Sequence, residues 1–171
     1  MNEVMKAILD RRSVRKFTDQ PVERAVLEEL TQAALHAPSG MCKKTWQFTV
    51  ISDPAKIKEL ADAIGSALGR DGYDMYRPTA LIIPSNERDS KFGMEDNACA
   101  LENIFLAAHA LGLGSVWINQ MRTICDDPRI RALLTGYGIP EDHVVYGLAA
   151  LGYPDGAPVS YKEGGKVVFV D

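Results

Sequence analysis

The sequence predicts a single domain in which helices cover a β-sheet, in the α/β or α+β class. Segments with apolar residues at helical spacing alternate along the chain with short runs of β-branched and apolar residues. The 171 residues suit one domain of ordinary size, and no repeat or low-complexity linker divides them. Hydrophobic residues make up 46% and charged residues 25%, so the chain can form its own core.

The first half of the chain is expected to contain two long helices and two strands. The segment 21–40 has apolar residues at helical spacing and ends at a proline and a glycine. The segment 52–69 begins with Asp53, a favourable N-cap residue, and with Pro54, which suits a first helical turn. A short amphipathic segment at residues 2–10 precedes both helices, and the expected strands are 46–51 and 79–85.

The second half of the chain contains the most apolar helix. The segment 94–114 is apolar on nearly all sides between Ala98 and Leu111, so this helix is expected to be central or buried by a partner subunit. Gly112 and Gly114 provide its end. The other expected elements are a strand at 115–118, a helix at 126–134, a strand at 144–154 and a last β-prone segment at 166–171, which could join the same sheet or a neighbour's sheet.

Composition and cysteine spacing exclude several classes of protein. The formal net charge of −4 argues against general nucleic-acid binding. No apolar run reaches the ~18 residues of a membrane span, and residues 1–17 lack an apolar core of signal-peptide length. Cys42, Cys99 and Cys125 are odd in number and widely spaced, which predicts neither a disulfide framework nor a metal site. A reduced cytoplasm is the simplest expected location.

A local basic cluster stands out in this acidic chain. Residues 11–17 read RRSVRKF and bring Arg11, Arg12, Arg15 and Lys16 close to Ser13. Guanidinium groups and a hydroxyl can converge on a phosphate. The same charges could instead stabilise the C-terminus of the preceding helical segment through the helix macrodipole. The residues alone leave both interpretations open.

Two glycine-containing loops allow a close approach of the backbone to a planar ligand. APSG at 37–40 and GLGSVWINQ at 112–120 could serve this purpose, and each could equally be an ordinary helix end. The chain has no GxGxxG, no phosphate-binding GxxxxGK[ST] loop and no GxSxG motif. It also shows no obvious set of acid, base and nucleophile. This pattern fits an enzyme whose chemistry is carried by an organic cofactor.

Four segments, taken in order, resemble the FMN-dependent nitroreductase family. They are RRSVRKF, AALHAPSG followed closely by WQFTVI, NIFLAAHALGLGSVWI and ALGYPDGAP. The resemblance implies an α+β fold with a central, mostly antiparallel sheet flanked by helices. It also implies an intertwined homodimer with FMN at the subunit interface. Residues 1–171 would form one FMN-binding domain, with 155–171 as a C-terminal extension that reaches the partner subunit.

The resemblance further implies which residues contact FMN. The basic cluster would hold the phosphate and ribityl chain, with Arg12 nearer the ring or ribityl chain. The PSG loop would reach the flavin from the partner chain, and the strand exit after GLGS would run beside the ring with a backbone N–H near flavin N5. A basic residue often follows the GYP segment, and the candidates are Lys162 first and Lys166 second. The other implied residues are Arg11, Arg12, Ser13, Arg15, Pro38, Ser39, Gly40, Trp117, Ile118, Asn119 and Gln120.

The chain departs from the family pattern directly after the PSG loop. The family usually has an Asn and then Gln-Pro-Trp, whereas this chain has Cys42, Lys44, Thr45 and Trp46 at these positions. Cys42 is therefore expected close to the flavin, without acting as a nucleophile. The departure bears on substrate specificity more than on FMN binding.

The implied activity is a ping-pong oxidoreduction. NADH or NADPH would give a hydride to FMN N5, and a small electron-poor substrate such as a nitroaromatic, a quinone or an enone would then receive it. No catalytic side chain and no metal are expected. The alternatives are a flavin-dependent dehalogenase or oxidative flavin enzyme of the same fold, and a non-catalytic flavin-binding module.

Overall fold

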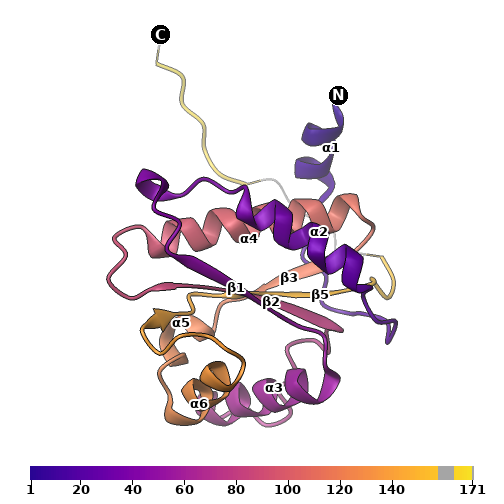
Figure 1. Ribbon diagram of the computed structural model, residues 1–171. Helices are drawn as coiled ribbons and strands as arrows, with labels where there is room; N and C mark the ends of the chain where they lie inside the picture. Colours follow the sequence, from indigo (N-terminus) through magenta and orange to yellow (C-terminus); the bar gives the residue numbers. More distant parts are fainter. Residues whose placement is uncertain (158–163, 171) are drawn as a thin grey trace.

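The computed structural model describes residues 1–157 and 164–170 and places one β-sheet between two layers of helices (Figure 1). The strand order is β1-β2-β5-β3, and the short β4 also pairs with β2. Every strand pair is antiparallel, which confirms the predicted mostly antiparallel α+β fold. The strands are β1 (Trp46–Ile51), β2 (Ala80–Glu87), β3 (Gly114–Ile118), β4 (His143–Val144) and β5 (Leu148–Gly152).

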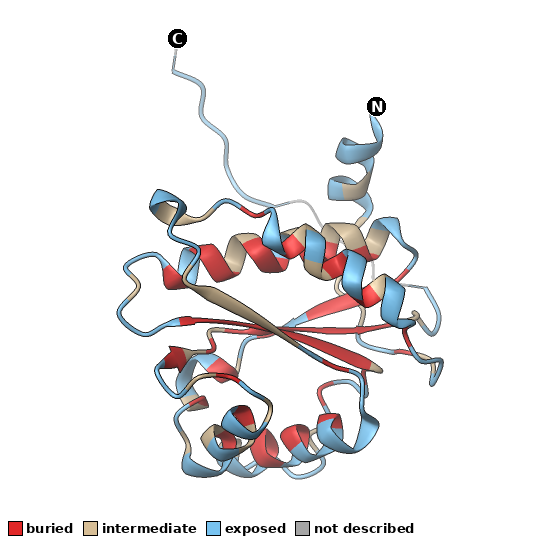
Figure 2. Ribbon diagram, viewed as in Figure 1, coloured by how far each residue is buried: buried red, intermediate tan, exposed pale blue. Residues whose placement is uncertain are grey.

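The two faces of the sheet carry different helices. One face is covered by α2 (Arg24–Leu35) and α4 (Gly93–Ala110), and the other by α3 (Pro54–Leu68), α5 (Met121–Ile124) and α6 (Pro128–Gly136). Each layer has its own apolar core, and β2 and β5 between them are almost wholly buried (Figure 2). Burial on both faces explains why these two strands read as continuous apolar runs.

Local signals in the sequence set several of these boundaries. The Asp53 side chain accepts a hydrogen bond from the Ala55 N–H at the start of α3, and Gly69 ends that helix with a left-handed φ of 61°. Asp127 caps α6 in the same way by accepting from the N–H groups of Arg129 and Ile130. The predicted Asp-Pro helix starts are therefore confirmed.

The strand predicted at 144–154 is wrong as one continuous element. Asn86 lies four positions after Ile82 on β2, whereas their partners Val144 and Ala149 lie five positions apart on the facing chain. The extra residue divides the predicted strand into β4 and β5, as at a β-bulge.

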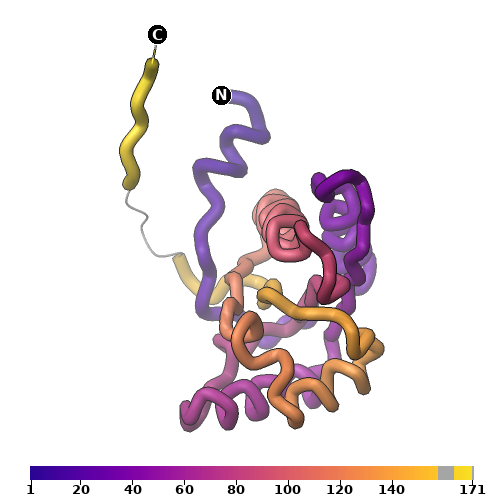
Figure 3. The backbone as a smooth tube through the Cα atoms, turned by 90° about the vertical axis from the view of Figure 1, so that its left-hand side faces the viewer, coloured from indigo at the N-terminus to yellow at the C-terminus, as the bar shows by residue number. Residues whose placement is uncertain are grey.

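Two terminal segments leave the body of the molecule on the side of α2 and α4. Helix α1 (Glu3–Asp10) buries none of its residues although it is amphipathic. Residues 164–170, which we call the C-terminal tail, are exposed and extend away from the sheet (Figures 1 and 3). The β-prone segment predicted at 166–171 is thus not a strand over 166–170 in the single chain, because no strand edge lies beside it.

None of the helices in the described residues combines the length and the apolar character that a bilayer crossing requires.

Candidate functional site

The basic segment at residues 11–15 lies along the outer edge of the sheet. Ser13 forms a parallel bridge with Ser115 at the start of β3, and the Val14 N–H donates to the Ser115 carbonyl oxygen at 2.9 Å. This pairing covers the edge of β3 that faces away from β5. The cluster that was isolated in the sequence is therefore placed beside the strand that follows GLG.

Close packing against Gly114 fixes the distance between the basic segment and β3. A Cβ atom added at Gly114 would lie 2.7 Å from Val14 Cγ1, so only a glycine lets the segment lie this close to β3. Val14 packs against the core under the sheet. Val14 also lines the same hollow as Arg11 and Arg12.

The cations of the cluster have different partners. Arg12 Nη1 donates to the carbonyl oxygens of Leu9 at 2.6 Å and Arg11 at 2.8 Å, so Arg12 serves the C-terminus of α1, as the macrodipole interpretation predicted. Arg11 Nε lies 3.8 Å from Glu102 Oε1 on α4. Arg11 and Arg12 line a hollow of about 260 Å³ with His109 and Ser115, whereas Arg15 lines a separate hollow.

The hollow at Arg15 has a strained wall. The Arg15 guanidinium lies 5.9 Å from the ring centroid of Tyr76, within cation–π range. Met75, Tyr76 and Arg77 all have left-handed backbone angles, with φ of 51°, 69° and 54°. Such values are uncommon for residues other than glycine and often occur at binding sites. In the same loop, burial raises the pKa of Tyr73 to about 12.

The exit of β3 presents an aromatic and polar surface. Trp117 is 37% exposed, and its ring lies 6.0 Å from the Phe105 ring of α4. A Cβ atom at Gly147 would lie 2.3 Å from Trp117 Nε1, so a glycine is needed beneath this indole. Asn119 is exposed, and the buried Oε1 of Gln120 has no hydrogen-bond partner among the described residues.

Ile118 could contribute to the predicted site only through its backbone. Its side chain is 1% exposed and belongs to the core on the α3 side of the sheet. The side chain therefore does not line a ligand site, because β3 alternates and Ile118 points to the opposite face from Trp117.

The PSG loop is held by one buried carboxylate that the sequence pattern did not single out. Asp96, in the first turn of α4, accepts from the Gly40 N–H at 2.8 Å and from the Ser39 hydroxyl at 3.0 Å. Ser39 Oγ in turn accepts from the Lys44 N–H at 3.0 Å. Pro38 and Cys42 are exposed on this loop, so part of it presents an ordered surface to solvent.

The loop and the basic segment do not meet within one chain. The loop is fixed to the first turn of α4, whereas Arg11 and Arg12 share a hollow with His109 at the last turn. Helix α4 has 18 residues, which corresponds to about 27 Å at 1.5 Å per residue. Of the two lysine candidates, Lys166 is exposed in the C-terminal tail and Lys162 lies outside the described residues.

The residues that do come together fit a phosphorylated planar molecule such as the expected FMN. The edge of β3 combines cationic side chains, the Ser13 hydroxyl, the partly exposed Trp117 and the Gln120 Oε1, which has no donor among the residues that the structure describes. A guanidinium group and a hydroxyl suit phosphate oxygens, and an indole with neighbouring amides suits the edge of a ring system.

Comparison with known proteins agrees with this geometry. Residues 8–153 match the model of the Nitroreductase family. The crystal structure of a nitroreductase with bound FMN from Bacteroides fragilis is 40% identical, with a TM-score of 0.92 and full coverage of both chains. An Archaeoglobus fulgidus protein named for both NADH dehydrogenase and NAD(P)H nitroreductase is 33% identical over 160 residues, which cover 90% of this chain and 87% of that protein. An NADPH-flavin oxidoreductase of Vibrio harveyi is 30% identical over 169 residues, which cover 92% of this chain and 68% of that protein. The chain belongs to the nitroreductase family.

Proposed function

We propose that this protein is an FMN-dependent oxidoreductase that takes a hydride from NADH or NADPH and passes it to a small electron-poor molecule such as a nitroaromatic, a quinone or an enone. The observation that carries the proposal is the position of Ser13 and its neighbouring arginines on the edge of β3. Ser13 pairs there with Ser115, which lies two residues before Trp117. The Bacteroides fragilis relative, which binds FMN, aligns over the whole chain.

The phosphate end of FMN would be held by Ser13 with Arg11 and Arg15 on either side. Arg15 is exposed, and among the described residues the Arg11 side chain has one long contact, to Glu102, which itself faces solvent. Both guanidinium groups could therefore turn to a phosphate at little energetic cost, because an exposed ion pair contributes only about 0–1 kcal/mol. Lys162 or Lys166 would add a further cation.

The ring end of FMN would lie at the exit of β3, beside Trp117, Asn119 and Gln120. When bound, FMN supplies the N5 atom that accepts and donates the hydride. The chain's own contribution is to orient the ring and to exclude water from one side of it. Trp117 is suited to this task because Phe105 and Gly147 hold its indole from two directions.

We propose that the complete site needs two copies of the chain. The PSG loop and the basic segment lie at opposite ends of α4. In a homodimer, Pro38, Ser39 and Gly40 of one copy would reach the flavin on the other copy, and exposed Cys42 would follow them. Two apolar surfaces are also free to bind a partner, since Val4, Met5, Ile8 and Leu9 of α1 are exposed, as are Val167, Val168, Phe169 and Val170 of the tail.

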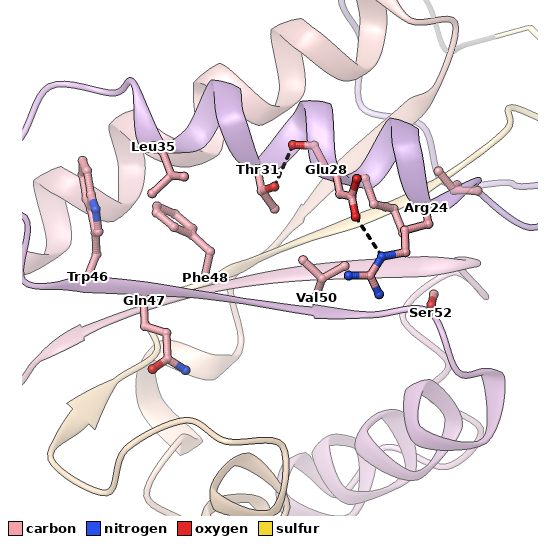
Figure 4. Close-up of a pocket in the computed structure, with 11 residues that line it drawn as sticks. Arg24, Glu28, Thr31, Leu35, Trp46, Gln47, Phe48, Val50 and Ser52 are labelled. Carbon is pink, nitrogen blue, oxygen red and sulfur yellow. Dashed lines mark hydrogen bonds and ion pairs between the residues drawn. The ribbon is translucent and has the colours of Figure 1, made fainter.

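The C-terminal tail has a matching surface on β1. On the described residues, β1 pairs with β2 on one side and with no strand on the other. A groove of about 520 Å³ runs between this free edge and α2, and Trp46, Phe48 and Val50 point into it from β1, with Leu35 of α2 above Phe48 (Figure 4). An apolar extended segment could pair with the edge and bury its side chains in the groove.

The occupant would be the tail of the second copy rather than the chain's own tail. The tail leaves the molecule at the opposite side from β1 (Figures 1 and 3). Residues 155–171 would in this way form the extension that joins the two subunits.

We also place the protein in the cytoplasm. Cys42, Cys99 and Cys125 are all free thiols, as expected for a reducing compartment, and NADH and NADPH are available there as donors.

Anaerobic flavin reduction tests the proposed function. The purified protein is reconstituted with FMN, freed of excess flavin and mixed with NADH or NADPH, and the absorbance of oxidised flavin is followed. We expect yellow protein that bleaches and regains its colour when a quinone is added. Yellow protein that does not bleach would favour another electron donor, as in a dehalogenase, or a binding role, and protein that takes up no FMN would contradict the proposal.

A further inference from the structure

The conformation of the PSG loop depends on a single buried side chain. Asp96 is only 4% exposed, and each of its carboxylate oxygens accepts one hydrogen bond from the loop. The two donors are the Ser39 hydroxyl and the Gly40 N–H, which are adjacent in the chain. Ser39 Oγ, which donates to Asp96, also accepts a hydrogen bond from the Lys44 N–H. Asp96 therefore acts on both ends of segment 39–44.

The loop would not keep this conformation by local preference. Met41, Cys42 and Lys44 have left-handed φ angles of 55°, 56° and 51°, and none of them is a glycine. Left-handed backbone angles are unfavourable for residues that carry a Cβ atom. Contacts from outside the loop must therefore hold it, and the contacts to Asp96 are charge-assisted and buried.

A more general role for Asp96 would be to stabilise the N-terminus of α4 by its negative charge. Glu95 shares this role, because it lies in the same first turn. Glu95 is exposed, and the structure gives it no hydrogen bond to the loop. The two neighbouring acidic residues thus separate the effect of charge at a helix end from the effect of loop positioning.

We propose that Asp96 is a positioning residue of the flavin site. It sets the loop so that Pro38, Ser39 and Gly40 of one copy meet the flavin held by the basic segment of the other copy. This inference rests on the proposed function, and it adds a residue whose effect passes through the loop rather than through contact with FMN.

The experiment compares Asp96→Ala, Asp96→Asn and Glu95→Ala. Amide hydrogen exchange over residues 38–44 is first measured on flavin-free protein, which reports on the loop without any enzyme activity. The dissociation constant of FMN and the visible spectrum of the bound flavin are then measured on the same variants. Ser39→Ala serves as a fourth variant in case Asp96→Ala does not fold. It removes both hydrogen bonds of Ser39 Oγ, the one it donates to Asp96 and the one it accepts from the Lys44 N–H, and leaves α4 intact.

The expected order follows the number of hydrogen bonds to the loop that each variant removes. Asp96→Ala should exchange at least about tenfold faster over 38–44 than Glu95→Ala, bind FMN at least about tenfold more weakly and shift the flavin spectrum. Asp96→Asn should lie between them, because its amide oxygen can still accept from one donor. Ser39→Ala should accelerate exchange over the same residues.

Three outcomes would overturn the inference. Equal exchange in Asp96→Ala and Glu95→Ala would show that the carboxylate does not hold the loop. Faster exchange with unchanged FMN affinity and spectrum would show that the loop does not serve the flavin. A wild-type protein that takes up no FMN would refute the proposed function itself, and this result is seen before any variant is compared.

Discussion

Substitution of Gly114 tests how closely the basic segment must approach β3. The added Cβ of Gly114→Ala would lie 2.7 Å from Val14 Cγ1 and 2.8 Å from Val14 Cβ. Contacts this short force a shift, and overpacking of this kind destabilises by about 1–3 kcal/mol. Against this, alanine restricts the unfolded chain and recovers about 0.4–1 kcal/mol. We expect a net loss of about 1–2 kcal/mol.

The shift should also be visible in cofactor binding. The residue that must move, Val14, lies between Ser13 and Arg15, and its N–H bond to Ser115 fixes both of them. FMN affinity should therefore fall about tenfold or more, since a charge-assisted hydrogen bond contributes about 1.5–3 kcal/mol. Riboflavin, which has no phosphate, should lose much less.

The assay combines thermal unfolding of the flavin-free protein with fluorescence titration of FMN and riboflavin. At this chain length a loss of 1–2 kcal/mol lowers Tm by about 3–6 °C. Gly136→Ala is the matched control, because an added Cβ at Gly136 meets nothing within 4 Å. If Gly114→Ala unfolds at the same temperature as Gly136→Ala and binds FMN with wild-type affinity, the close approach has no functional consequence and the reasoning is wrong.

Three further predictions concern the phosphate, the thiol and the tail. Arg15→Ala should weaken FMN by about tenfold or more and riboflavin much less in parallel titrations, and equal losses would show that Arg15 does not hold the phosphate. Cys42→Ser should keep a similar rate of flavin reduction by NADH or NADPH in stopped-flow measurements, because we expect the thiol to lie near the flavin without acting as a nucleophile. A loss of several orders of magnitude in a folded, FMN-loaded variant would contradict this. Truncation before Lys166 should lower both dimer stability and FMN retention. A truncated protein that stays dimeric in sedimentation, keeps its flavin and melts at the wild-type temperature would show that the tail is dispensable.

Local patterns predicted most of the elements, because their causes are local. Asp53 and Asp127 cap the helices that their Asp-Pro pairs indicated. The alternation of Trp46, Phe48 and Val50 predicted a strand with one apolar face, and these side chains do share the face toward α2. Each of these features depends on residues within a few positions along the chain.

The error in the strand predicted at 144–154 arose where distant residues decide, whereas the position of the Ile118 side chain follows a local rule. The division between β4 and β5 depends on the register against β2, which no pattern within 144–154 records. Ile118 looked like part of a ligand-lining segment, but strand alternation sends its side chain into the core.

The candidate site was predictable in its parts but not in its geometry. The cluster at 11–17 allowed both a phosphate and a helix-end interpretation, and the structure gives Arg12 the second role while Ser13 pairs with distant Ser115. Glu95 and Asp96 are adjacent acids with no difference in pattern, and only the packing of α4 against the PSG loop separates their roles. Hydrogen bonds between residues 56 or 57 positions apart leave no periodic signal in the sequence.

A mixed dimer tests most directly the claim that two copies build each flavin site. One chain carries Arg15→Ala, and the other carries Gly40→Val, which displaces the PSG loop because any Cβ at Gly40 would lie 2.3 Å from the Phe92 ring. If the loop of one copy serves the flavin of the other, both defects fall in one site and the second site is intact. We expect one tightly bound FMN per mixed dimer, isolated through two affinity tags, and no tightly bound FMN in either homodimeric variant. Two weakened sites and no tight one in the mixed dimer would contradict the shared site.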